Sequence, residues 1–286
     1  MTPIKFAAVL VAVVFSLQAS TPDNQPAEPV RIADNLYFVG ASDISSYLIT
    51  TPSGHILIDA GYEATVPLIE ASVTKLGFKL SDIKILLNTQ AHFDHAAGFA
   101  KLKKLTGAQL MISAADVPII EAGGRGDFVI PDAESAFPPV KVDRALNDGD
   151  QVKLGNVTLT ARWTPGHTKG CTTWTFDVVD RGKRYHAVVL GGLTILPGTR
   201  LTGKPSYPTI QSDYERTFEV LTHLPVDIFL GAHPSYYGGA KKADELRAHP
   251  NGPNPFVDPS AFKAYVERAR QRFNDQVARE KMIRPV

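Results

Sequence analysis

The chain contains very little cysteine and no marked excess of either charge. Cys171 is the single cysteine among 286 residues, so no intramolecular disulfide can form. The formal net charge is +1, and no cluster of Lys and Arg is long enough to indicate a nucleic-acid-binding surface. The fold must therefore rely on a hydrophobic core and on any metal that it binds, and we expect no nucleic-acid partner.

Long hydrophobic runs are also lacking. The longest, Phe6–Leu17, follows Lys5 and precedes small residues such as Ala19. A membrane-spanning helix needs about 20 apolar residues, so this run predicts no membrane span, whereas its pattern is typical of a secretory signal peptide. We expect residues 1–20 to be a cleaved signal peptide and residues 21–286 to form a single domain, which makes the mature protein periplasmic or secreted. A buried N-terminal helix or an uncleaved anchor is the alternative.

Short apolar runs alternate with segments of helical spacing along the mature chain. Strands are expected at 36–39, 46–50, 55–59, 83–87, 108–112, 151–154, 157–162, 172–178, 185–190 and 227–230. Helices are expected at 66–76, 96–105 and 260–281, with 217–224 as the middle of another. This alternation, twice over, predicts an α/β fold with two β-sheets between helical layers. The Gly-, Pro- and Asp-rich connection at 121–140 is long enough to indicate a functional loop.

Polar residues follow three of the predicted strands, where side chains project into clefts. They are Gln90, His92, Asp94, His95, His167 and His233. Imidazole and carboxylate groups are ligands that Zn²⁺ prefers. We predict one zinc site made by Gln90, His92 and His167 and a second made by Asp94, His95 and His233. A hydroxide shared between the two ions would be the nucleophile, because zinc lowers the pKa of bound water to about 7.

The remaining histidines and the cysteine are interpreted as structural or surface residues. These histidines are His55, His186, His223 and His249. Cys171 lies four residues after His167, which leaves open a metal-ligand or thiol role. Because cysteine is among the most buried residue types, we interpret it as a small core residue.

The motifs around these ligands resemble those of the metallo-β-lactamase superfamily. The matching segments are His92-Phe93-Asp94-His95, Gly166-His167 and Gly231-Ala232-His233, together with Ile58-Asp59-Ala60-Gly61. The family's first motif usually reads His-x-His-x-Asp-His, whereas Gln90 stands first here. This departure resembles the GOB-like variant of subclass B3, which also shows Asn-Thr-Gln-Ala-His-x-Asp-His. The resemblance implies the αβ/βα four-layer sandwich, with two sheets between helical layers.

An absent carboxylate favours the β-lactamases within this superfamily. Glyoxalase II and the lactonases carry an Asp that bridges both metals, in a Gly-Asp pair after a strand between the second and third His motifs. The corresponding stretch here is Leu190-Gly191-Gly192-Leu193-Thr194, which contains neither a carboxylate nor the zinc-ligand cysteine of the first subclass. The pattern therefore resembles subclass B3, in which Asp and two His hold the second metal.

The resemblance implies zinc-dependent hydrolysis of the β-lactam ring of penicillins, cephalosporins and carbapenems by metal-bound hydroxide. Asp94 would orient the nucleophile in addition to binding zinc, Thr194 would lie near the substrate carboxylate, and Phe128 in the 121–140 loop would cover the substrate. An amide oxygen is a weaker zinc ligand than imidazole, so we expect one or two zinc ions per chain, with the Gln90 site the weaker. We expect a monomer whose partner is a small β-lactam. A lactone or thioester hydrolase of the same fold, and a zinc-binding relative without activity, remain alternatives.

Overall fold

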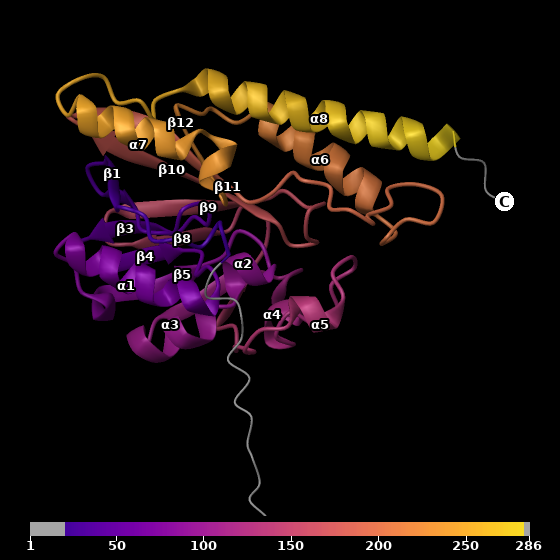
Figure 1. Ribbon diagram of the computed structural model, residues 1–286, viewed down its shortest axis with the longest axis horizontal. Helices are drawn as coiled ribbons and strands as arrows, with labels where there is room; N and C mark the ends of the chain where they lie inside the picture. Colours follow the sequence, from indigo (N-terminus) through magenta and orange to yellow (C-terminus); the bar gives the residue numbers. More distant parts are fainter. Residues whose placement is uncertain (1–20, 283–286) are drawn as a thin grey trace, which may run out of the picture.

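Two β-sheets lie face to face between two layers of helices in the computed structural model (Figure 1). The structure describes residues 21–282. The predicted signal peptide, residues 1–20, lies outside the described residues and stays a prediction. The arrangement is the predicted αβ/βα sandwich. Among the helices described, none is long and apolar enough to cross a membrane.

The first sheet has seven strands that follow one another in chain order. They are β1 Val30–Ala33, β2 Leu36–Phe38, β3 Tyr47–Thr51, β4 Gly54–Ile58, β5 Ile83–Leu87, β6 Gln109–Ser113 and β7 Arg144–Leu146. Pairing is antiparallel from β1 to β4 and parallel from β4 to β7. In β4, Ile56 and Ile58 face the core between the sheets and Leu57 faces the outer helices. This strand is buried on both faces, which explains its continuous apolar run.

The second sheet has five strands in the order β12-β11-β10-β9-β8. They are β8 Gln151–Leu154, β9 Val157–Trp163, β10 Thr172–Asp180, β11 Lys183–Leu190 and β12 Ile228–Gly231. Pairing is antiparallel except between β11 and β12, which run parallel. Trp174 of β10 is fully buried in the core that joins the two sheets.

Helices cover the outer face of each sheet (Figure 1). Helices α1 Val66–Lys75 and α3 Phe99–Thr106 lie on the first sheet, and α6 Ile210–Thr222, α7 Gly239–Ala248 and α8 Pro259–Met282 lie on the side of the second. The short helices are α2 Phe93–Ala96, α4 Val117–Glu121 and α5 Asp132–Ser135, of which α5 lies within the predicted 121–140 loop.

Several boundaries differ from the prediction. Strands β1 and β7 and helix α7 were not expected, and α6 begins at Ile210, so that residues 217–224 cover its end rather than its middle. The helix expected at 96–105 is two helices, α2 and α3. The chain breaks there because it packs against the end of β4: the Gly98 amide donates to the Gly61 carbonyl, and a β-carbon on Gly98 would lie 2.4 Å from the Ala60 carbonyl oxygen. This contact fixes the loop that carries the predicted ligands.

Candidate metal centre

The predicted ligands meet at one edge of the sandwich because each follows the end of a strand. Gln90 to His95 follow β5, His167 follows β9 and His233 follows β12. Strands β4 and β5 are parallel neighbours, as are β11 and β12. Their carboxyl ends therefore lie together, as binding residues of α/β sheets commonly do.

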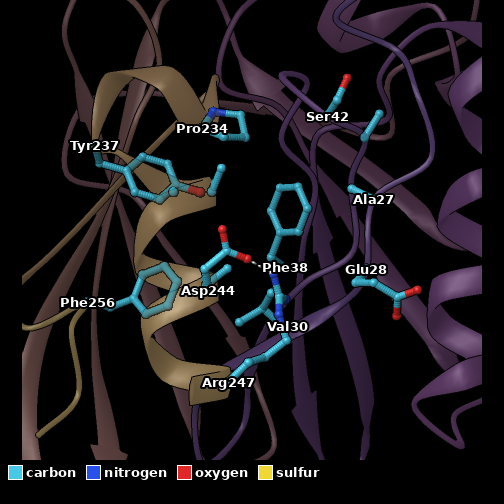
Figure 2. Close-up of a pocket in the computed structure, with 14 residues that line it drawn as sticks. Ala27, Glu28, Val30, Phe38, Ser42, Pro234, Tyr237, Asp244, Arg247 and Phe256 are labelled. Carbon is cyan, nitrogen blue, oxygen red and sulfur yellow. Dashed lines mark hydrogen bonds and ion pairs between the residues drawn. The ribbon is translucent and has the colours of Figure 1, made fainter. Parts of the chain in front are cut away.

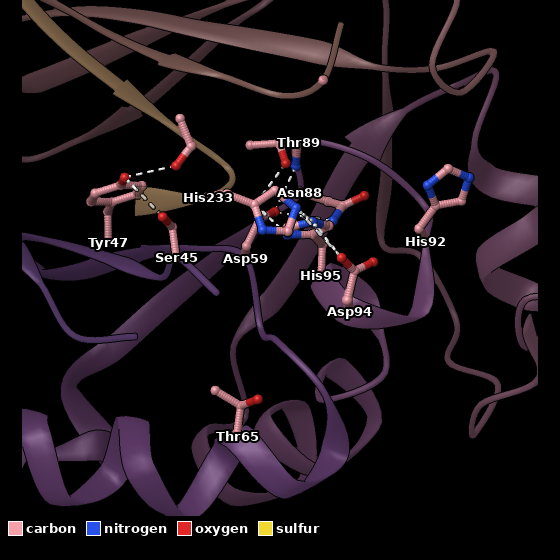
Figure 3. A network of polar contacts seen from close by, with 12 residues as sticks. Ser45, Tyr47, Asp59, Thr65, Asn88, Thr89, His92, Asp94, His95 and His233 are labelled. Carbon is pink, nitrogen blue, oxygen red and sulfur yellow. Dashed lines mark hydrogen bonds and ion pairs between the residues drawn. The ribbon is translucent and has the colours of Figure 1, made fainter. Parts of the chain in front are cut away.

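One cluster consists of Asp94, His95 and His233, and its ligand atoms all lie within 4.8 Å of one another (Figure 3). His95 Nε2 is 3.1 Å from Asp94 Oδ2 and 3.2 Å from His233 Nε2. His233 Nε2 is 3.6 Å from the same Asp94 oxygen. These three side chains could hold one metal ion, as the sequence predicts.

A second cluster brings His92 and His167 together, with His92 Nδ1 lying 3.2 Å from His167 Nε2. Gln90, two residues before His92, is buried, and its Oε1 has no hydrogen-bond partner among the described residues. A buried carbonyl oxygen without a partner is energetically costly. A metal ion held jointly with the two histidines would supply that partner.

Hydrogen bonds to the far ring nitrogens fix which nitrogen of each histidine carries the lone pair. His167 Nδ1 donates to the Thr194 carbonyl oxygen at 2.6 Å, and His233 Nδ1 donates to the Asp43 carbonyl oxygen at 2.7 Å. In a neutral imidazole the other nitrogen is then an acceptor. The Nε2 atoms of His167 and His233 therefore present lone pairs to the two clusters.

Carboxylates lie beside the far nitrogens of the other two histidines. Asp127 Oδ2 is 3.3 Å from His92 Nε2, and Asp59 Oδ2 is 3.6 Å from His95 Nδ1. Asp127 favours a proton on His92 Nε2, which leaves a lone pair on His92 Nδ1. His95 faces a carboxylate at both ring nitrogens, because Asp94 Oδ2 lies 3.1 Å from its Nε2. The cluster of His92 and His167 thus holds two imidazole lone pairs 3.2 Å apart. These repel unless a proton or a cation lies between them, and such supported imidazoles are the donors that zinc takes.

The electrostatics keep Asp94 and His167 in the forms that bind a metal. Burial raises the pKa of Asp94, but His95, His233 and His92 lower it more, so the pKa lies below its ordinary value. Burial and the neighbouring His92 lower the pKa of His167 to about 3. Burial lowers the pKa of His95, but Asp94, Asp59 and Asp23 together raise it more, so the pKa lies above its ordinary value and metal would displace a proton there.

Asp59 is the best-supported carboxylate around the site (Figure 3). It is fully buried and accepts hydrogen bonds from the Thr89 amide at 2.7 Å, the Thr89 hydroxyl at 2.6 Å and the Asn88 side chain at 3.1 Å. Its backbone is in the left-handed region with φ of 62°, which costs free energy in a residue other than glycine. Burial raises its pKa to about 6. This geometry makes Asp59 a positioning residue for His95.

Sequence reasoning missed these supporting aspartates. Asp43, Asp116 and Asp127 come from loops far from the ligands in sequence, and only the fold brings them near. Asp116 holds the turn after His167, accepting hydrogen bonds from the Thr168 hydroxyl at 2.9 Å and the Gly170 amide at 2.7 Å. Asp59 alone left a signal, as a polar residue that ends an apolar strand.

The residues interpreted as structural lie outside both clusters. Cys171 is buried, its sulfur accepts a hydrogen bond from the Gly192 amide at 3.2 Å, and burial raises its pKa to about 12. It is therefore a neutral thiol, as expected of a core residue. His55 packs edge-on against Phe78. The Thr194 side chain is exposed, and its backbone oxygen holds His167.

A separate cavity of about 240 Å³ is lined mainly by apolar side chains (Figure 2). Val30, Phe38, Tyr237 and Phe256 are among its lining residues. None of the predicted ligands lines it, so the candidate chemistry lies in the clusters at the strand ends.

Comparison with known proteins agrees with the fold and with the motifs. The profile of the metallo-beta-lactamase superfamily matches residues 39–180. The native FEZ-1 metallo-beta-lactamase from Legionella gormanii is 45% identical, with a TM-score of 0.87 over 91% of this chain and 99% of that chain. The chain belongs to the metallo-beta-lactamase superfamily.

Further solved structures of this superfamily point to subclass B3. BJP-1, a subclass B3 metallo-beta-lactamase of Bradyrhizobium japonicum, is 40% identical, with a TM-score of 0.85 over 91% of this chain and 97% of that chain. The metallo-beta-lactamase GOB-18 from Elizabethkingia meningoseptica is 37% identical, with a TM-score of 0.85 over 90% of this chain and 94% of that chain. The structural neighbours are thus metallo-beta-lactamases, and BJP-1 is of the subclass B3 that the motifs predict.

Curated relatives of the superfamily match a smaller part of the chain. Hydroxyacylglutathione hydrolase of Hyphomonas neptunium is 34% identical over 130 residues, which is 45% of this chain and 41% of that protein. The chain therefore spans less than half the length of this relative. Both groups place the chain among metallo-hydrolases.

Proposed function

We propose that the protein is a zinc-dependent β-lactamase of the subclass B3 type, which hydrolyses the β-lactam ring of penicillins, cephalosporins and carbapenems. The observation that carries the proposal is the extent of the similarity. The chain matches 99% of the length of a metallo-beta-lactamase that is 45% identical to it, whereas it matches 41% of the length of the hydroxyacylglutathione hydrolase. Fold alone does not fix function, so the arrangement of the site must also support the reaction.

The residues present fit a zinc centre. Asp94, His95 and His233 would hold one ion, and Gln90, His92 and His167 would hold the other. When bound, zinc supplies a nucleophile from water at neutral pH and polarises the substrate carbonyl. The Gln90 site has the weaker donor set, since it lacks a carboxylate and one of its three donors is a neutral amide.

Asp94 supplies the carboxylate that the reaction needs beside the water. Its pKa is held below the ordinary value by three histidines, so it is ionised at neutral pH. It would accept a hydrogen bond from the attacking water and orient it toward the substrate carbonyl. A positioned carboxylate in this role contributes about 10²- to 10⁴-fold to the rate.

Two further features suit a bicyclic substrate that carries a carboxylate. Thr194 is exposed and lies in the segment that follows β11. Its hydroxyl would donate a hydrogen bond to the substrate carboxylate. Phe128 of the 121–140 loop packs against Tyr207, with ring centroids 4.8 Å apart. We propose that this loop covers the apolar part of the substrate.

The second candidate is hydrolysis of a thioester, because the curated relatives include hydroxyacylglutathione hydrolases. The Gly191-Gly192 stretch, which lacks the bridging Asp expected of such enzymes, argues against it. A lactone is the remaining alternative of the same kind.

The test compares substrates on the purified mature protein, residues 21–286. A carbapenem, a cephalosporin, a penicillin, a lactone and a hydroxyacylglutathione thioester are each assayed with added zinc and with a chelator. We expect chelator-sensitive turnover of the β-lactams, loss of turnover in His233→Ala and no change in His223→Ala, which removes an exposed histidine. Turnover of the thioester or lactone alone would refute the proposal.

A further inference from the structure

The carboxylate of Asp127 has a place in the site that the ligand motifs do not assign. Asp127 lies in the 121–140 loop, its side chain is only 5% exposed, and Oδ2 is 3.3 Å from His92 Nε2. His92 Nε2 is itself buried and has no hydrogen-bond partner among the described residues, so the Asp127 carboxylate at 3.3 Å is an ion-pair contact. Asp127 is thus the polar group that this nitrogen faces.

The other oxygen of Asp127 organises the loop. Oδ1 accepts hydrogen bonds from the amides of Val129 and Ile130, both at 2.8 Å. The neighbouring Phe128 is held by its packing on Tyr207. The two oxygens therefore have different partners: one fixes the backbone turn, and the other is aimed at His92.

We propose that Asp127 is a positioning residue that keeps the His92 proton on Nε2 and the lone pair on Nδ1, facing His167, so that the 121–140 loop sets the zinc affinity of the Gln90 site. The proposal rests on the proposed zinc-dependent function. A carboxylate that accepts the far N–H of a ligand histidine fixes its ring and makes the imidazole a better donor. Such support matters most here, because Gln90 contributes only a neutral amide.

The substitution Asp127→Asn tests the roles of the two carboxylate oxygens separately, because it keeps one oxygen and replaces the other by an amino group. Two backbone amides need an acceptor, so the Asn carbonyl should take the place of Oδ1 and preserve the turn. The Asn amino group then faces the His92 N–H, and two donors oppose each other. Glu134→Gln is the matched control, because Glu134 is an exposed carboxylate in the same loop.

Zinc affinity is measured on metal-free protein by competition with a chromophoric chelator. We expect Asp127→Asn to weaken the Gln90 site by about 10- to 100-fold and to leave the Asp94 site unchanged, while Glu134→Gln binds both ions as the wild type does. Unchanged affinity of the Gln90 site in Asp127→Asn would overturn the proposal.

The tautomer of His92 provides a second readout, which decides the matter if the wild type takes up a single zinc. Long-range ¹H–¹⁵N spectra of the metal-free protein distinguish a proton on Nε2 from one on Nδ1. We expect the Nε2–H form in the wild type and in Glu134→Gln, and its loss in Asp127→Asn. A wild-type proton on Nδ1, or the same tautomer in all three proteins, would contradict the proposal. Neither measurement uses a β-lactam, so a failure of the proposal for Asp127 is distinct from a failure of the proposed β-lactamase activity.

Discussion

Replacing Thr89 by Val tests whether the buried support of His95 has the energetic weight that its geometry indicates. The Thr89 hydroxyl lies 2.6 Å from Asp59 Oδ2, the same oxygen that lies 3.6 Å from His95 Nδ1. Val keeps the shape of Thr but removes the hydroxyl. The hydrogen bond from the backbone amide of residue 89 to Asp59 is kept. Asp59 is fully buried, so water cannot replace the lost donor.

The expected cost is about 1.5–3 kcal/mol in the free energy of unfolding of the metal-free protein, because the lost hydrogen bond goes to a charged, buried group. With weaker support, His95 should also bind zinc about tenfold less tightly in the Asp94 site. Thr89→Ser is the control: it keeps the hydroxyl and loses one methyl group, for about 1 kcal/mol.

Urea unfolding at pH 8 gives the stability, and chelator competition gives the zinc affinity. The account requires Thr89→Val to be less stable than Thr89→Ser and to bind zinc more weakly. If the Val variant is as stable as the Ser variant and holds zinc equally well, the reasoning about Asp59 is refuted.

Three other substitutions give distinct results. Gln90→His replaces an amide by an imidazole and should tighten the weaker zinc site by at least tenfold in chelator competition; weaker binding would show that Gln90 is not a ligand. Asp94→Asn should lower kcat for a carbapenem by about 10²- to 10⁴-fold in the zinc-loaded protein, and retained turnover would exclude the role given to Asp94. Burial raises the pKa of Asp116 from 3.8 to about 6, so the native state binds this proton more tightly than the unfolded chain. The stability that this provides is present below pH 4 and is lost, by about 3 kcal/mol, as the pH rises through 6. Asp116→Asn should flatten that part of the pH profile of urea unfolding in the metal-free protein, and an unchanged slope would contradict the assignment.

The sequence was sufficient for most of the fold, because the strands that carry the site contain apolar runs that end at polar residues. Strand β5 was predicted with its observed bounds, Ile83–Leu87, and the hairpins β3–β4 and β8–β9 follow their turn residues. Edge strands β1 and β7 are short, and each contains an Arg, so neither shows a continuous apolar run. The break between α2 and α3 depends on a tertiary contact of Gly98 with the end of β4, which no local pattern reveals.

The candidate ligands were predictable for a similar reason. His92, Asp94 and His95 stand within one short motif directly after a buried strand. The groups that orient them were not predictable, since Asp43 and Asp127 reach their histidines from distant loops. Their roles follow from distances that only the folded chain defines.

Zinc titration of the metal-free protein, with bound zinc and carbapenem hydrolysis followed together, tests the central claim most directly. The account predicts that the first equivalent of zinc binds Asp94, His95 and His233, that hydrolysis begins with this equivalent, and that His233→Ala loses both while His167→Ala keeps the tight ion. Folded protein that binds zinc at these residues without hydrolysing any β-lactam, or a Gln90 site that fills first, would contradict it.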